Sequence, residues 1–334
     1  MAKIKFINFY ESLSKKQRAE FRRFACSPYF NKGRSYLPVI DSINRICGKE
    51  LSSKEVIKIL SGELNSKSRT LWNRLSELMK MSEYFILTKY FEEDKTLFNN
   101  IISSYYVSNS MFNLFVQKNK SNIKSFNNSK INLKTFYNIF ENKENEGFYD
   151  IYTNRHREYI FSLKEQVIYH SASFIIKHYL HLTELLQQQK IGMEQLESIG
   201  VTFLSDDDTI EFLENIKTNY NVLYKLAAFQ FNIYKAFSDT NHEEYYAKAR
   251  EISKQVMAKL NDDYKLYIYQ LMVNYCINQT NRFIHKYYKE LFEIYNEKLE
   301  QNLFQDLKVG NFPVNNFRDY IFVSLKLKKL DWAK

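Results

Sequence analysis

Three histidines, His170, His178 and His181, have the spacing that comes closest to a site of chemistry in this chain. On one helix they would lie near a common face, where their imidazole nitrogens could bind a transition metal. Glu184, three residues after His181, is the single carboxylate at ligand spacing from them. Because a zinc site needs a complete set of ligands, we expect partly buried structural histidines and predict no metal site.

A cluster of three carboxylates, Asp206 to Asp208, is the second candidate. Clustered carboxylates can bind a divalent cation, but this run lacks the glycine and the distal glutamate of a calcium-binding loop. Carboxylates also suit the first turn of a helix, which carries a partial positive charge. We therefore expect the cluster to lead into a helix over residues 209–217.

The sequence contains none of the motifs that identify common enzyme classes. It has no G-x-S-x-G nucleophile turn, no H-E-x-x-H zinc motif and no glycine-rich phosphate loop. Cys26, Cys47 and Cys276 are odd in number and lie outside any C-x-x-C spacing, which indicates reduced thiols. We predict a protein that is not an enzyme, with no catalytic residue and no cofactor.

Composition favours long helices over sheets. The chain has 7 Gly and 3 Pro in 334 residues, and its 26 Tyr and 27 Phe can fill a helical core. Its start lacks the apolar run of a signal peptide, and no stretch approaches the roughly 18 apolar residues of a membrane span. These features predict an all-α protein in the cytoplasm, with no membrane partner.

An internal repeat is the main evidence on architecture. The segments YYAKARE (245–251) and YYKELFE (287–293) align at an offset of 42 residues, and the segments before them align at the same offset. Pairs of helices repeated every ~40 residues are typical of an α-solenoid, whose neighbouring hairpins share a continuous core. We predict a right-handed α-solenoid of helical hairpins, with a plain helical bundle as the alternative. Thr240 and Glu243 predict a capping box within it.

The last predicted helix of the repeat region, residues 317–328, has an apolar face that includes Phe317 and Phe322. After it, the segment LDWAK (330–334) places Trp332 where the two repeats have a tyrosine. A terminal repeat normally has a polar outer face. We therefore expect further repeats or another subunit to cover this end.

The net charge of +10 is concentrated near the N-terminus. Residues 1–90 hold 18 Lys and Arg against 8 Asp and Glu, whereas residues 91–334 hold 30 against 30. We therefore divide the chain into a basic N-terminal helical module (1–90), a helical middle region (91–218) and the repeat hairpins (219–334).

Within the basic module, predicted helices over 56–60 and 66–80 follow each other as in a helix-turn-helix. Lys67, Arg69 and Arg74 would be exposed on the second helix. Basic side chains that displace phosphate counterions supply much of the affinity for nucleic acids. The residues that follow are acidic, where a winged module would have a basic hairpin. Nucleic-acid binding through these three residues is our alternative prediction.

Local patterns predict further boundaries. Ser14 with Gln17, and Ser52 with Glu55, predict capped helix starts, and Gly62 predicts a helix end. Residues 84–87 could be a strand or a continuing helix, 117–130 a loop or a short helix, and 141–147 a polar turn. Residues 152–189 predict one or two long helices, whose expected buried positions are Tyr159, Phe161, Val167, Phe174, Leu182 and Leu186.

Three segments carry a resemblance to a known group of proteins. They are S-x-x-L-W-N-R-L-S-E-L-M (68–79) with E-Y-F (83–85), S-P-Y-F-N (27–31), and L-D-W-A-K (330–334). In these segments the chain resembles uncharacterised bacterial helical-repeat proteins of tetratricopeptide-like type. The resemblance implies a tetratricopeptide-like all-α fold and no known activity, although the period of 42 exceeds the ~34 residues of that repeat.

Taken with the repeat, these features predict a scaffold whose concave face binds a protein or peptide partner. Tyrosine is enriched at interface hot spots, so our candidate anchors are Tyr246, Tyr269, Tyr275 and Tyr288. Packing in the core explains these tyrosines equally well. The alternative function is a regulator that binds nucleic acid through the basic module.

Overall fold

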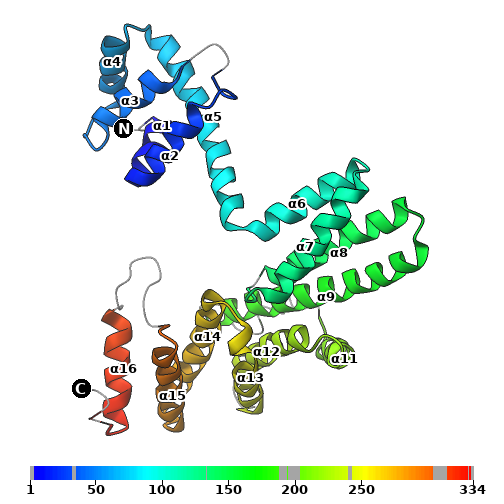
Figure 1. Cartoon of the computed structure of the whole chain (residues 1–334). Helices are drawn as coiled ribbons and strands as arrows, with labels where there is room; N and C mark the ends of the chain where they lie inside the picture. Colours follow the sequence, from blue (N-terminus) through cyan, green and yellow to red (C-terminus); the bar gives the residue numbers. More distant parts are fainter. Residues whose placement is uncertain are drawn as a thin grey trace. The chain divides into compact units, whose positions relative to one another are not determined.

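The computed structural model describes residues 4–31, 35–132, 134–187, 194, 204–239, 243–303, 314–329 and 331. These residues form fifteen α-helices and one short 3-10 helix and contain no β-strand (Figure 1). The all-α class predicted from the sequence is therefore confirmed. The predicted capping box at Thr240 and the position of Trp332 lie outside the described residues.

The chain divides into two compact units, residues 1–98 and 99–334. The division falls within α6 (Lys95–Ser108), whereas position 90, where we placed the end of the basic module, lies inside α5 (Ser68–Glu93).

The first unit is built around the long helix α5. Its other helices are α1 (Lys5–Ser12), α2 (Lys15–Ala25), α3 (Leu37–Ile46) and α4 (Ser53–Leu64), and α1, α2 and α4 all pack against α5. Phe21 of α2 is fully buried and meets Phe85 of α5 edge-on, with ring centroids 5.4 Å apart. Residues 84–87, left open between strand and helix, thus belong to a helix of 26 residues.

In the first unit, two helix starts agree with the prediction from the sequence and one helix end does not. Both predicted capping boxes form: Ser14 and Ser52 each accept from the backbone N–H three residues on, and the side chain there accepts in return. Gly62, however, lies inside α4, which ends two residues later. Asn65 caps it in the left-handed conformation with φ of 43°, a backbone region that asparagine tolerates better than most residues.

The second unit begins within α6 and continues with three more helices. After α6 come α7 (Phe112–Asn128), α8 (Thr135–Tyr152) and the 32-residue α9 (His156–Gln187). α8 packs along α9, and α7 packs against α8. Residues 117–130, for which a loop and a short helix were both open, are therefore largely helical, because α7 continues to Asn128. The predicted polar turn at 141–147 is wrong, because those residues lie within α8.

Two helical pairs follow. They are preceded by α11 (Asp206–Ile216) and consist of α12 (Asn221–Ser238) with α13 (Glu243–Val256), and α14 (Asp262–Asn281) with α15 (Lys286–Glu300). The 3-10 helix η1 (Met257–Lys259) joins the pairs, and α16 (Val314–Lys326) packs against α15. α12 also contacts α9 and α14, so the helices from α9 to α16 form a continuous series (Figure 1). One hydrophobic core extends from Phe136 of α8 through this series to Val323 of α16.

Candidate partner-binding surfaces

The tyrosines proposed as anchors are mostly in the core. Tyr246, Tyr269 and Tyr275 are 5%, 0% and 1% exposed, and Tyr288 is half-buried against the core beside Phe322. Tyr246 of α13 stacks on Tyr275 of α14, with ring centroids 4.4 Å apart and planes 12° apart. The prediction that Tyr246, Tyr269 and Tyr275 are surface anchors is therefore wrong. Their burial agrees with the alternative, in which these tyrosines pack in the core.

The reason is the position of α14 between two neighbours. Because α12 lies on one side of this helix and α15 on another, residues around most of its circumference are buried. A helix that is apolar nearly all round has no amphipathic stripe. Sequence periodicity therefore could not say which tyrosines faced water.

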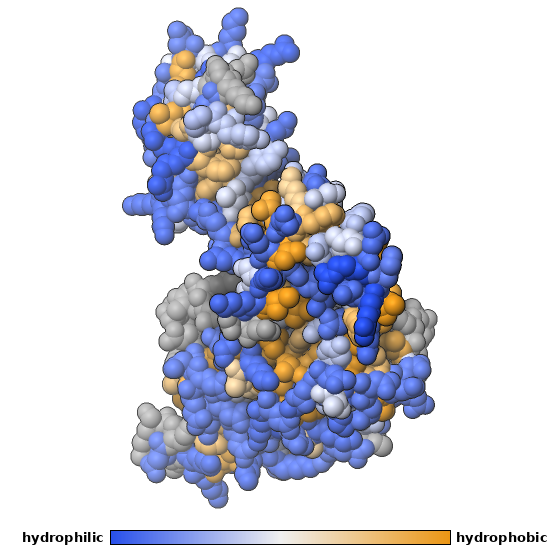
Figure 2. All heavy atoms as spheres, turned by 45° about the vertical axis from the view of Figure 1, so that its right-hand side comes forward, coloured by the Kyte–Doolittle hydropathy of each residue, from blue (hydrophilic) through white to orange (hydrophobic). Residues whose placement is uncertain are grey.

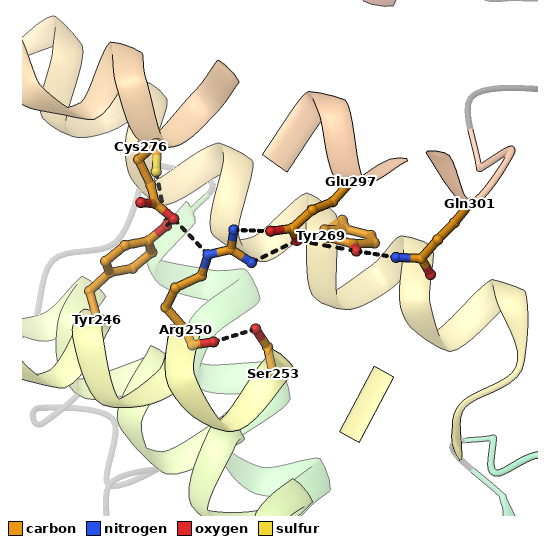
Figure 3. Close-up of polar contacts among 8 residues, drawn as sticks. Tyr246, Arg250, Ser253, Tyr269, Cys276, Glu297 and Gln301 are labelled. Carbon is orange, nitrogen blue, oxygen red and sulfur yellow. Dashed lines mark hydrogen bonds and ion pairs between the residues drawn. The ribbon is translucent and has the colours of Figure 1, made fainter. Parts of the chain in front are cut away.

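Two of these tyrosines take part in a buried polar network centred on Arg250 (Figure 3). The Arg250 side chain is 8% exposed. Its Nε lies 2.6 Å from a Glu290 carboxylate oxygen, and its two Nη atoms lie 2.6 and 2.9 Å from the two oxygens of Glu297. Arg250 is on α13 and both glutamates are on α15, so the network joins the two helical pairs.

The surroundings in this network keep Arg250 and Cys276 protonated. Burial by itself would lower the pKa of Arg250, but hydrogen bonds and charge from Glu297 and Glu290 raise it overall. Burial raises the pKa of the Cys276 thiol to about 12, although its hydrogen bond with the Tyr246 hydroxyl, 3.1 Å away, lowers it. A thiol with so high a pKa is a poor nucleophile. The network is thus a structural joint, and it offers no activated group.

An open groove of about 550 Å³ lies over this joint, between α13 and α15. Its charged walls are largely matched within the chain: Arg250 binds two glutamates, and Lys286 pairs with Glu243. Because these side chains already form ion pairs within the chain, the groove offers little uncompensated charge to attract a ligand.

A different surface of the second unit is apolar and exposed. We define the outer α8–α9 face by Phe148 and Ile151 of α8 and by Ile160, Leu163, Val167 and Phe174 of α9. These side chains are 41 to 66% exposed. The α9 members are spaced three, four and seven residues apart, which places them in one stripe along the helix. Figure 2, in which the side of the α8–α9 hairpin comes forward, shows hydrophobic residues gathered over the helices of this region.

This face corrects an expectation. Phe161, Val167 and Phe174 were expected to be buried, yet they are 60, 57 and 41% exposed, whereas Leu182 is buried as predicted. The difference at Phe161 and Val167 follows from the length of α9: α12 packs against the C-terminal part of this helix, where Tyr179 meets Phe231 and Tyr234. The sequence pattern indicated which faces of the helix are apolar. It could not indicate how far along α9 another helix would cover such a face.

The interior of the same layer contains several buried amides. Asn142 of α8 donates to Asn119 Oδ1 at 2.8 Å, and Asn100 of α6 donates to the Asn138 carbonyl at 2.9 Å. Asn122 of α7 also donates to Ser103, and this pair is buried. The helices α6 to α9 thus bury amides beside apolar residues such as Phe115, while α8 and α9 also present apolar side chains to solvent.

The three basic residues of the predicted nucleic-acid site lie at the start of α5. Lys67 precedes its first turn and Arg69 lies within that turn; both are exposed, while Arg74 is half-buried. No ion pair joins any of the three to a carboxylate among the described residues. α5 then continues without a break to Glu93, so the described part of this unit has no wing.

The histidines and aspartates considered from the sequence have other contacts in the structure. His170 packs on Phe140, His178 stacks on Phe174, and His181 lies 3.4 Å from Glu184 on the surface. Burial lowers the pKa of His178. Asp206 to Asp208 form the first turn of α11, and Ser205 accepts from the Asp208 N–H at 3.0 Å. Among the described residues no three His, Cys, Asp or Glu are grouped to hold a metal ion.

Comparison of this chain with known proteins finds no matching family model, no matching curated protein and no matching solved structure. No helix of the described chain is both long and apolar enough to cross a membrane.

Proposed function

We propose that this protein is a non-enzymatic helical scaffold that binds another protein through its outer α8–α9 face. The observation that carries the proposal is the exposure of six large apolar side chains on α8 and α9, in a layer whose interior also holds buried amides. Contiguous exposed apolar patches on proteins mark interaction sites. Phe148 and Phe174 are 47% and 41% exposed, so covering one of them completely removes on the order of 100 Å² from water, which contributes about 2.5 kcal/mol.

The proposal includes a right-handed, tetratricopeptide-like α-solenoid as the platform behind this face. It is supported by the two helical pairs, since each helix of the second pair begins 41 or 43 residues after its counterpart in the first. It is also supported by the contact of α12 with α14 and by the ion pairs from Arg250 of α13 to α15. Stacked hairpins share a core with their neighbours and present a firm surface to a partner.

The proposal is tested by using the purified chain to capture proteins from a nuclease-treated lysate of the native host, and by repeating the capture with two matched double variants. Ile160→Ser with Val167→Ser removes the two most exposed side chains of the face. Ile86→Ser with Ile210→Ser removes two comparably exposed isoleucines elsewhere. We expect a retained protein to be lost from the first double variant and kept by the second. Equal retention by both variants, with both folded by circular dichroism, would show that the face is not the binding site.

A second function, nucleic-acid binding by the first unit, is favoured by the exposure of Lys67 and Arg69 without carboxylate partners. Its signature is an affinity for a DNA or RNA duplex that falls steeply with salt, with a slope of about −0.9 per neutralised phosphate. Arg69→Ala with Arg74→Ala should reduce that slope, whereas Arg157→Ala with Arg318→Ala in the second unit should not. Absence of binding to duplexes and single strands at low salt would exclude this function.

A further inference from the structure

The first unit contains an apolar groove with a basic rim, which is separate from the outer α8–α9 face. We call it the Trp72 groove. Its volume is about 450 Å³, and it lies between α1, the start of α4 and α5. Phe6, Leu75 and Met79 are among its apolar lining residues, and Trp72 forms a wall with 46% of its surface exposed.

Two lysines complete the groove. Lys5 begins α1 and Lys80 lies two helical turns after Trp72 on the same side of α5; both line the groove and are exposed. No ion pair joins either lysine to a carboxylate among the described residues. The first unit as a whole holds 19 Lys and Arg against 11 Asp and Glu. The rim therefore has unmet positive charge in a unit that is positive overall.

We propose that the Trp72 groove binds a short protein segment that has apolar anchor residues flanked by carboxylates. The apolar lining and the exposed indole fit an anchor side chain, because tryptophan is enriched at binding hot spots. The lysines fit the flanking carboxylates and reject cationic flanks, since charges at the edge of an interface mainly set specificity and the rate of association.

Single-stranded nucleic acid is the competing class of ligand, because it too combines flat apolar groups with negative charge. Proteins that bind single strands stack successive bases on successive aromatic side chains. Here Trp72 is the one exposed aromatic residue that lines the groove, since its other aromatic residue, Phe6, is buried. One indole above an aliphatic lining fits an apolar side chain better than a run of bases.

Two synthetic peptide libraries test the proposal on the full chain. Each library holds short peptides with two Leu or Phe positions four residues apart, flanked by Asp and Glu in one library and by Lys and Arg in the other. Trp332→Phe leaves Trp72 as the sole tryptophan of the chain, so its emission reports directly on the groove. We expect binders from the acidic library to shift this emission to shorter wavelength.

Variants decide whether the groove is the site. Trp72→Ala should weaken the selected acidic peptides by about thirtyfold, as for a hot-spot residue. Lys5→Glu with Lys80→Glu should weaken them by about tenfold, since each rim charge contributes less than a factor of about five, and should make the chain prefer the basic library. Lys15→Glu with Lys16→Glu changes the same number of charges at the first turn of α2, outside the groove, and should leave binding unchanged.

Several results would overturn the proposal: no binder in either library, a preference of the unaltered chain for basic flanks, or peptide binding that survives both groove variants. A single-stranded oligonucleotide that displaces the peptides and binds more tightly would assign the groove to nucleic acid instead. None of these results depends on the outer α8–α9 face, so this proposal and the scaffold function can fail separately.

Discussion

Replacing Arg250 by methionine removes the cation that holds two carboxylates of α15 against α13. Methionine keeps most of the volume of the side chain, so the change mainly leaves Glu290 and Glu297 as like charges without their partner. Both carboxylates are partly shielded, with side chains 24% and 28% exposed. Removing one partner of a buried ion pair costs about 3–5 kcal/mol. Because water still reaches these carboxylates, we expect about 3 kcal/mol.

Calorimetry measures this loss as a shift of the unfolding temperature. For a unit of this size, each kcal/mol corresponds to about 2–4 °C, so Arg250→Met should lower the transition by roughly 6–12 °C. Hydrogen exchange followed by mass spectrometry locates the effect, and we expect faster exchange in peptides from α13 and α15 while peptides from the first unit stay unchanged.

Two further variants control the reasoning. Arg318 pairs with Asp319 on the surface, and its side chain is 74% exposed; Arg318→Met should therefore cost under about 0.5 kcal/mol. Adding Glu290→Gln and Glu297→Gln to Arg250→Met removes the unpaired charges and should recover most of the loss. If Arg250→Met cost no more than Arg318→Met, or if the added glutamines recovered nothing, the network would not be the joint between the two pairs.

Three other predictions follow from buried polar groups. Cys276, whose pKa burial raises to about 12, should resist alkylation in the native chain while the two half-buried cysteines react, and early modification seen by mass spectrometry would contradict its burial. Asn142→Ala leaves the Asn119 carbonyl without its donor and should cost about 1–3 kcal/mol in urea unfolding; an unchanged midpoint would refute a tight polar layer. Burial raises the pKa of Asp150 above its ordinary value of 3.8, so as pH rises the carboxyl loses its proton at a higher pH in the folded chain than in the unfolded chain. Stability therefore falls as pH rises from the unfolded pKa through the folded pKa. Asp150→Asn, which can still accept from Ser162, should therefore stabilise the chain at neutral pH relative to low pH, and a uniform loss at both would contradict this sign.

Local signals in the sequence located many elements correctly. The capping boxes at Ser14 and Ser52 form as predicted, and the acidic run from Asp206 begins α11. The offset of 42 residues matches the spacing of two helical pairs. These features depend on residues within one or two helical turns, or on a comparison of the chain with itself, so a sequence contains them fully.

The polarity of a residue did not predict its exposure in the helices α8 and α9. Residues 141–147 are rich in Asn and Glu, which suggested a turn, yet Asn142 is 1% exposed within α8 because Asn119 of α7 accepts its hydrogen bond. Val167 is apolar, which suggested burial, yet no described helix covers it. A buried amide needs a specific partner, and that partner lies on another helix.

The amino-acid sequence was sufficient to predict the all-α class, the positions of the capped helix starts, the repeat in the second unit and the positive charge of the first. Each of these follows from composition, short-range hydrogen bonding or periodicity. The tertiary structure alone decided that Tyr246, Tyr269 and Tyr275 are core residues and that the α8–α9 hairpin presents an apolar face. Burial depends on which helix lies opposite a given face, and contacts between distant segments fix that choice.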